Sequence, residues 1–291
     1  MLSSIGNGYG KAASLATGVV ACLLMATGAS AAEMAKSPAV TSGAALKKLQ
    51  DAVNGEHRAA DRKARDVYRH PVETLSFFGI QPSMTVVELW PFGGWYTEIL
   101  APYVKGSGTY YAAAMDPAST RQGDLNYNAS LKKILDARPD LYGEVKWTVL
   151  APGKFQIAPD GTADLVLTFR NIHNWHWSGI DKDVWAAAFR ALKPGGVLGV
   201  VEHRNNDPAY APAVRGNAYV GEDWTVKEIE AAGFKLAGRS EVNYNPKDTK
   251  DYPKGVWTLP PNYAEGDKDR EKYAAIGESD RFTLKFVKPA K

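Results

Sequence analysis

The regular alternation of short apolar segments with longer amphipathic ones, from residue 85 onward, constrains the fold most strongly. The short segments are typical of strands buried on both faces, and the first five cover residues 85–90, 109–114, 145–150, 164–169 and 197–203. Helices are predicted near residues 95–103, 129–137, 182–192 and 223–232. Strands that alternate with helices indicate an α/β domain, with a parallel sheet covered on both faces.

Two more apolar runs, at residues 234–242 and 281–287, are not separated by a recognisable helix and could pair antiparallel. We therefore predict a doubly wound, seven-stranded, mostly parallel sheet with an antiparallel last strand. This domain is expected to cover residues 72–288, after a helical N-terminal arm at residues 32–71. Gly55 is expected to break the arm into two helices.

The composition excludes several classes of protein. Of 291 residues, 45% are hydrophobic and 23% are charged, as in ordinary globular domains. The formal net charge of +3 is too small to indicate a nucleic-acid partner or an anionic membrane surface. We therefore expect no nucleic-acid partner, and the sequence indicates no oligomeric state.

Residues 1–31 have the pattern of a secretory signal peptide, in which an apolar, alanine-rich run follows a lysine and ends at Ala29-Ser30-Ala31. Cleavage after Ala31 would remove the single cysteine, Cys22, and a chain without thiols suits an oxidising compartment. We therefore predict a periplasmic or secreted protein. A lipoprotein anchored through Cys22 ranks second, because an apolar mature start would be unusual. No transmembrane segment is predicted after cleavage.

Three motifs lie at the ends of predicted strands. They are VVELWPFGGWYTEILAPY at residues 86–103, ADLVLTFRNIHNW at 163–175 and ALKPGGVLGVVEH at 191–203. Together they resemble class I S-adenosylmethionine-dependent methyltransferases, and most closely a bacterial group of predicted exported methyltransferases. The resemblance covers about residues 58–288. It implies a Rossmann-like methyltransferase fold, S-adenosylmethionine as cofactor, and methyl transfer to an unidentified small molecule.

The first motif departs from the pattern of that superfamily, acidic-x-Gly-x-Gly-x-Gly. Glu88 matches the acidic position and Gly94 the last glycine, whereas Trp90 and Phe92 replace the other two glycines and Gly93 is additional. The resemblance places Glu88, Trp90, Gly93 and Gly94 on the cofactor side. The alternative is that the glycine pair only permits a tight turn between strand and helix.

Two further residues are assigned to the cofactor. Asp116 is the only acid near the end of the second strand and could accept hydrogen bonds from the ribose, although an Asp before a proline is also an ordinary turn residue. Asn171, in the fourth-strand motif, is implied by the resemblance. No residue is assigned to the adenine.

Histidines gather at the same predicted sheet edge. His173, His176 and His203 are candidates for a general base or for orienting the substrate, because imidazole accepts protons near neutral pH. The alternative is that such residues cap helices or fill the core. The three imidazoles also offer a zinc site with an open position, so a metal-dependent hydrolase is a third hypothesis, although we predict no metal. The second hypothesis, ranked after a methyltransferase, is an exported small-ligand binding protein that has a methyltransferase fold and has lost catalysis.

Polar segments flank these motifs. A charged run that includes Arg62, Arg65 and Arg69 could form a roof over the cofactor or a solvated helix face. Residues 204–221 could form a lid, and residues 243–280 could cover the pocket or remain solvated.

Overall fold

The computed structural model describes residues 43–290, which belong to one compact unit. The predicted signal peptide, Cys22 and the first part of the predicted arm lie outside the described residues. None of the helices between residues 43 and 290 is long and apolar enough to span a bilayer.

Seven strands form one sheet in the order β3-β2-β1-β4-β5-β7-β6. They are β1 (Thr85–Leu89), β2 (Thr109–Ala114), β3 (Lys146–Val149), β4 (Ala163–Phe169), β5 (Leu192–His203), β6 (Lys235–Ser240) and β7 (Arg281–Val287). The first five pair in parallel, and β7 runs antiparallel to both of its neighbours, β5 and β6. The predicted seven-stranded sheet with an antiparallel last strand is confirmed.

The helices begin with a short arm and then alternate with the strands. They are α1 (Gly43–Asn54), α2 (Ala60–Lys63), α3 (Asp66–Arg69), α4 (Pro71–Phe78), α5 (Thr97–Val104), α6 (Gln122–Ala137), α7 (Pro139–Tyr142), α8 (Ile172–Trp177), α9 (Asp181–Ala191), α10 (Glu222–Ala231) and α11 (Arg270–Ile276), with a 3₁₀ helix η1 at Gly255–Thr258. The predicted break at Gly55 is confirmed, since α1 ends one residue before it.

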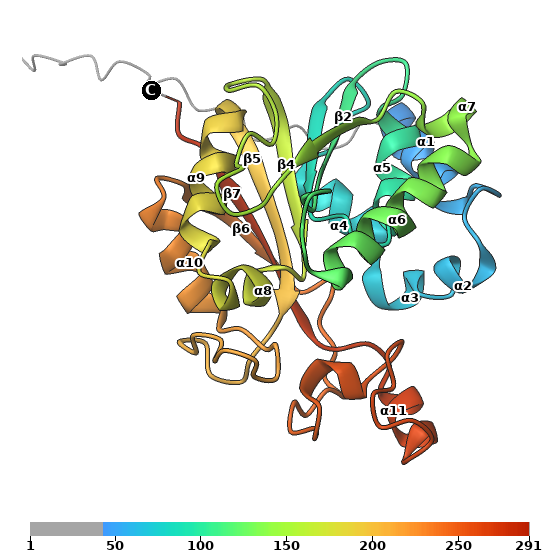
Figure 1. The fold of residues 1–291 in the computed structure, drawn as a ribbon, viewed down its shortest axis with the longest axis vertical. Coiled ribbons are helices and arrows are strands. Elements are labelled where there is room, and N and C mark those ends of the chain that lie inside the picture. The colour runs from blue at the N-terminus through green and yellow to red at the C-terminus, as the bar shows by residue number, and fades with distance from the viewer. Residues whose placement is uncertain (1–42, 291) are drawn as a thin grey trace, which may run out of the picture. The chain divides into compact units, whose positions relative to one another are not determined.

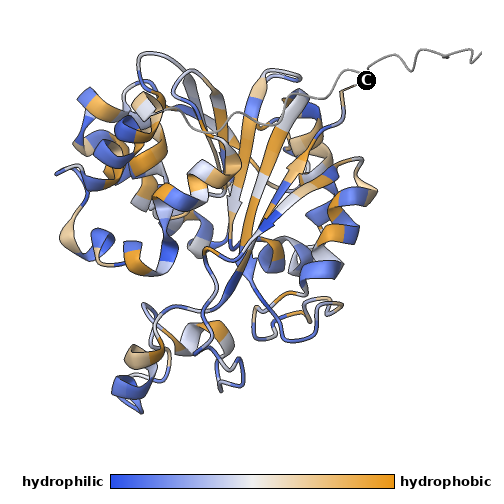
Figure 2. Cartoon of the chain, turned by 180° about the vertical axis from the view of Figure 1, so that it is seen from behind, coloured by the Kyte–Doolittle hydropathy of each residue, from blue (hydrophilic) through white to orange (hydrophobic). Residues whose placement is uncertain are grey.

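The side chains of the central strands alternate between two hydrophobic cores. Val86 packs in one core with residues of α1, α4 and α5, while Val87 packs in the other with residues of α8, α9 and α10. These two groups of helices lie on opposite sides of the sheet (Figure 1). Hydrophobic residues are concentrated in the central strands (Figure 2), as expected for strands covered on both faces.

The topology fixes where a ligand can bind. The chain leaves β1 through α5 toward β2, and β4 lies on the other side of β1, so the order of the strands reverses there. In open α/β sheets, ligands bind outside the carboxyl ends of the strands at such a point.

Several elements differ from the prediction, among them α6, α8 and β5, and the short helices α7, α11 and η1 were not predicted. Helix α6 begins at Gln122 rather than near residue 129, because its first turns are polar and only Leu131 is buried, which leaves no apolar stripe to recognise. Residues 172–177, for which no helix was predicted, form α8. Strand β5 begins at Leu192, five residues earlier than expected, because the backbone around Gly195 and Gly196 bonds to Lys288.

Candidate functional site

A cavity of about 440 Å³ opens at the carboxyl ends of β1, β4 and β5. Its walls come from the turn after β1, from the segment joining β4 to α8, and from the end of β5. Its size lies within the range of small-molecule sites. All three sequence motifs therefore meet at one place.

Two segments far apart in the sequence cover this cavity. Arg62, Arg65 and Arg69 of the helical arm line it, as do Trp257 and Glu278 from the segment before β7. Both segments lie at the same end of the sheet, near the labels α3 and α11 (Figure 1). The charged run thus lines the cavity rather than forming only a solvated helix face, and the segment at residues 243–280 covers the cavity.

The turn after β1 keeps a glycine-like backbone although aromatic residues replace two of its three glycines. Trp90 and Phe92 both have a φ of 46°, and Gly94 has a φ of 71°. These are the three positions at which the superfamily pattern has glycine. Because a bulky side chain in the left-handed region is strained by about 1–2 kcal/mol, such residues concentrate at functional sites.

Trp90 and Phe92 behave differently within this turn. The indole of Trp90 is 7% exposed, donates a hydrogen bond to the carbonyl of Leu150 at 2.7 Å, and packs edge-on against Trp175. Phe92 is only half-buried and packs against the exposed ring of Tyr127 on α6. Trp90 is therefore part of the core, while Phe92 and Tyr127 form a pair at the surface.

A second cavity, of about 530 Å³, lies beyond these rings at the ends of β1 and β2. Both cavities are lined by Trp90, Phe92, Tyr127 and Asn174. Met115 and Asp124 line the second cavity alone. The two cavities are thus neighbours, divided by the aromatic side chains of the turn.

Glu88 is buried at the first cavity and hydrogen-bonded from one side. Its Oε2 accepts hydrogen bonds from Thr97, at 2.9 Å, and from Tyr110. Burial raises the pKa of Glu88 to about 7, although these two hydrogen bonds oppose the rise. Its carboxyl group is therefore able to gain or lose a proton near neutral pH.

Asn171 joins the ends of β1 and β4. Its Nδ2 donates to the carbonyl of Leu89 at 2.9 Å, and its side chain is fully buried. Its Oδ1 has no hydrogen-bond partner among the described residues. The side chain that was assigned to the cofactor thus holds the two strand ends together, and it is not among the described residues that line either cavity.

His173 and His203 come together beside a carboxylate. The two imidazole rings lie 5.6 Å apart, and Nδ1 of His173 is 3.3 Å from Oε1 of Glu202. Glu202 also accepts the backbone N–H groups of Ile172 and His203, which fixes its position. Burial, followed by the nearby imidazole of His173 and the guanidinium group of Arg281, lowers the pKa of His203 well below its ordinary value. His203 is therefore neutral at pH 7.

The other two predicted residues lie elsewhere. His176 contacts Asp181 through Nδ1 at 2.7 Å, packs against Trp224, and is not among the described residues that line the cavity. Asp116 pairs with Lys154 at 2.7 Å and caps its own turn at Ala118. The hydrogen bond from Lys154 lowers the pKa of Asp116.

The predicted set of three imidazoles does not form, because His176 stands apart. Within residues 43–290, the one group whose atoms could together hold a metal ion is His173, Glu202 and His203. Both oxygens of Glu202 already accept backbone hydrogen bonds. The arginines beside His203 also disfavour a cation. This group therefore fits an orienting role better than a metal site.

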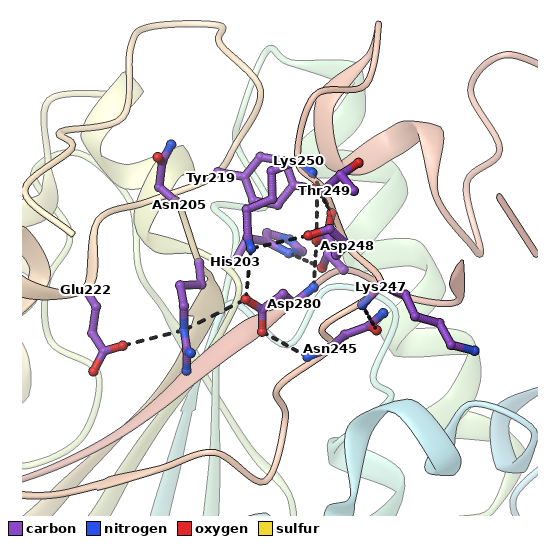
Figure 3. Close-up of polar contacts among 12 residues, drawn as sticks. His203, Asn205, Tyr219, Glu222, Asn245, Lys247, Asp248, Thr249, Lys250 and Asp280 are labelled. Carbon is purple, nitrogen blue, oxygen red and sulfur yellow. Dashed lines mark hydrogen bonds and ion pairs between the residues drawn. The ribbon is translucent and has the colours of Figure 1, made fainter. Parts of the chain in front are cut away.

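A polar network holds the cover over the first cavity (Figure 3). The hydroxyl of Tyr219 donates to Asp248 at 2.9 Å, and Asp248 accepts the backbone N–H of Asp280. Asp280 in turn pairs with Lys250 at 3.2 Å. The hydroxyl of the neighbouring Ser279 lies 2.6 Å from Nδ1 of His203. The network thus connects residues 204–221 to the covering segment and to the site.

Comparison with known proteins identifies the fold. No family model and no curated protein matches the chain. A SAM-dependent methyltransferase from Aquifex aeolicus shares 16% identity over 84% of this chain and 98% of that chain, with a TM-score of 0.52. The cyclase SpnF also shares 16% identity, over 85% of this chain and 93% of that chain, with a TM-score of 0.54.

The chain has the class I methyltransferase fold. At this level of identity the similarity establishes the fold alone.

Sequence reasoning missed three residues of the site: Glu202, Arg170 and Asp124. Glu202 and Arg170 stand inside quoted motifs at strand ends, so their position was a usable signal. Asp124 could not be found in this way, because α6 begins earlier than its pattern suggests.

Proposed function

We propose that this chain binds S-adenosylmethionine and transfers its methyl group to a small molecule. The turn after β1 carries this proposal, because all three of its glycine positions keep a left-handed backbone although two of them hold aromatic residues. A turn needed only for chain reversal would not require strain at two bulky side chains.

The residues present fit the cofactor. The first cavity offers Glu88 and the backbone of Gly93, and the adjoining second cavity offers the carboxylate of Asp124. Asp124 is the better candidate for the ribose, because it lines the second cavity, whereas Asp116 lines neither cavity. The faces of Trp90 and Phe92, which line both cavities, add a π surface that suits a cationic sulfur.

When bound, the cofactor supplies a methyl group on a sulfonium, which a nucleophile displaces. The chain must then align the acceptor, exclude water and remove a proton from an oxygen or nitrogen nucleophile. The covering segment with Trp257 excludes water. If Nδ1 of His173 donates to Glu202, its Nε2 is left as the proton acceptor. His203, neutral and adjacent, orients the acceptor.

Substitution of His173 tests this assignment against His176. In His173→Gln, consumption of S-adenosylmethionine with a small-molecule extract as the acceptor source should fall by about 100-fold or more, because the general base is lost. Binding of S-adenosylhomocysteine should stay within about twofold of the wild-type value. His176→Gln is the matched control, since His176 stands outside the cavity, and it should keep its activity. Equal activity of His173→Gln and wild type would contradict the assignment.

A second function is an exported binding protein without catalysis. One structure with the same fold is named as a cyclase, and a fold does not fix a chemistry. Tight binding of a small molecule, without methyl transfer to any acceptor tested, would favour this alternative.

We also propose that the protein is exported, on the pattern of residues 1–31. Mass measurement of protein recovered from the periplasm or medium should find a chain that begins at Ala32. An intact Met1 in cytoplasmic protein would contradict export.

A further inference from the structure

Positive charge in the first cavity exceeds the negative charge available to it. Arg65, Arg69 and Arg281 all pair with Glu278, at 2.6 Å for Arg65 and 3.0 Å for Arg69. Burial alone would raise the pKa of Glu278, but the three guanidinium groups outweigh it and hold the pKa well below its ordinary value. One ionised carboxylate thus serves three arginines.

A fourth guanidinium, that of Arg170, lines the same cavity. Within the described part of the chain, no carboxylate lies at ion-pair distance from Arg170, and its side chain makes no hydrogen bond. Burial and the charge of Arg281 lower the pKa of Arg170 to about 10, so it stays charged at neutral pH. Arg170 is half-buried, so its unpaired guanidinium group is left facing the cavity, where a ligand can supply the opposite charge.

The backbone also indicates a functional role for Arg170. Its φ is 62°, directly after the end of β4, and its N–H donates to the carbonyl of Val201 at 2.7 Å. A long side chain in the left-handed region is uncommon, and such residues recur where a side chain must point into a site.

The cofactor alone cannot balance these charges. S-adenosylmethionine carries one carboxylate against an ammonium and a sulfonium, so it adds net positive charge to the cavity. Glu88, with its pKa of about 7, offers only a partial negative charge at neutral pH. A neutral or cationic acceptor would leave the guanidinium groups unbalanced.

We infer that the methyl acceptor is a small organic oxyanion, held through its carboxylate or phosphate by Arg170 and the arginines around Glu278. This inference rests on the proposed function, whose substrate class it names. A planar guanidinium binds such groups through two parallel hydrogen bonds. The rest of the acceptor would lie against Phe169 and Trp257, which line the same cavity.

Calorimetric titration of the mature full chain with simple probes tests the inference. Benzoate and phenyl phosphate should bind, and the better of the two identifies the head group. Benzamide, the neutral counterpart of benzoate, should bind at least about tenfold more weakly, because a charged hydrogen-bonding group is lost. Failure of both anions to bind, or equal binding of benzamide, would overturn the inference.

Variants of Arg170 locate the site. Asparagine tolerates the left-handed backbone, and Arg170→Asn should bind the better probe about tenfold or more weakly than wild type. Arg170→Lys keeps the positive charge and should lose less affinity for the probe. Arg190→Gln, at an exposed arginine on α9, should bind as wild type does. A normal thermal unfolding midpoint shows that each variant is folded, and unchanged affinity in folded Arg170→Asn would remove Arg170 from the site.

Titration of the same probe at saturating S-adenosylhomocysteine separates the acceptor from the cofactor. Retained affinity supports an acceptor site beside the cofactor. Competition would show that the arginines hold the carboxylate of the cofactor, which overturns the inference and leaves the proposed function intact. Anion binding by a protein that does not bind S-adenosylhomocysteine would refute the proposed function and keep only the anion site.

Discussion

At the scale of single residues, the site depends on side chains in conformations that their type disfavours. Trp90, Phe92 and Arg170 all have positive φ values although none is glycine. The sequence showed that two glycines were replaced, but it could not show whether the turn had kept its shape. The structure shows that it has, with one ring built into the core and the other at the surface.

Restoring glycine at these two positions should therefore change the free energy of unfolding by very different amounts. Trp90→Gly removes a buried indole and should lower the free energy of unfolding by about 3 kcal/mol or more, even after the strain is relieved. Phe92→Gly loses a half-buried ring but also relieves strain, so it should stay within about 1 kcal/mol of wild type. Urea unfolding measures both, and similar losses in the two variants would contradict the different roles of the rings.

Glu88 should make stability depend on pH. Its pKa rises from 4.5 to about 7 on folding, so the folded protein holds the proton more tightly than the unfolded chain. This contribution to stability is complete below pH 4.5 and is lost as the pH rises through about 7. Glu88→Gln stays neutral, so its free energy of unfolding relative to wild type should increase by about 3 kcal/mol across that range. A difference that does not change with pH would refute the raised pKa.

At the scale of elements, strands were easier to predict than the helices and loops around them. Strand β2 and strand β7 match their predicted bounds, because short apolar runs between turns are a strong signal. Helix α8 and η1 are short, and their patterns are too brief for a helical period. Whether the two long polar segments cover a cavity depends on contacts between distant residues, which no local pattern contains.

The covering segment should loosen when its connection to residues 204–221 is weakened. Tyr219→Phe removes the hydroxyl that donates to both oxygens of the buried Asp248. The loss should cost about 1–3 kcal/mol and appear first as faster amide exchange at residues 243–280. Tyr244→Phe is the control, since the side chain of Tyr244 is exposed. Unchanged exchange in Tyr219→Phe would show that the network does not hold the cover.

At the scale of the whole molecule, the alternation of segments and the three motifs were sufficient to predict the fold and the sheet edge that carries the site. They could not show which of His173 and His176 faces the cavity, because the two residues lie about one helical turn apart on α8. The two histidines differ in the carboxylate that each contacts, which is Glu202 for His173 and Asp181 for His176. These contacts come from tertiary structure. The formal net charge of +3 also did not indicate the excess of arginine in the cavity, because these arginines come from segments that are distant in the sequence.

Titration of the mature chain with S-adenosylmethionine and S-adenosylhomocysteine tests the central claim most directly. We expect saturable binding of both at one site per chain, weakened in Asp124→Asn and unchanged in Asp116→Asn, because only Asp124 lines the second cavity. Absence of binding at millimolar concentrations of either compound would contradict the account.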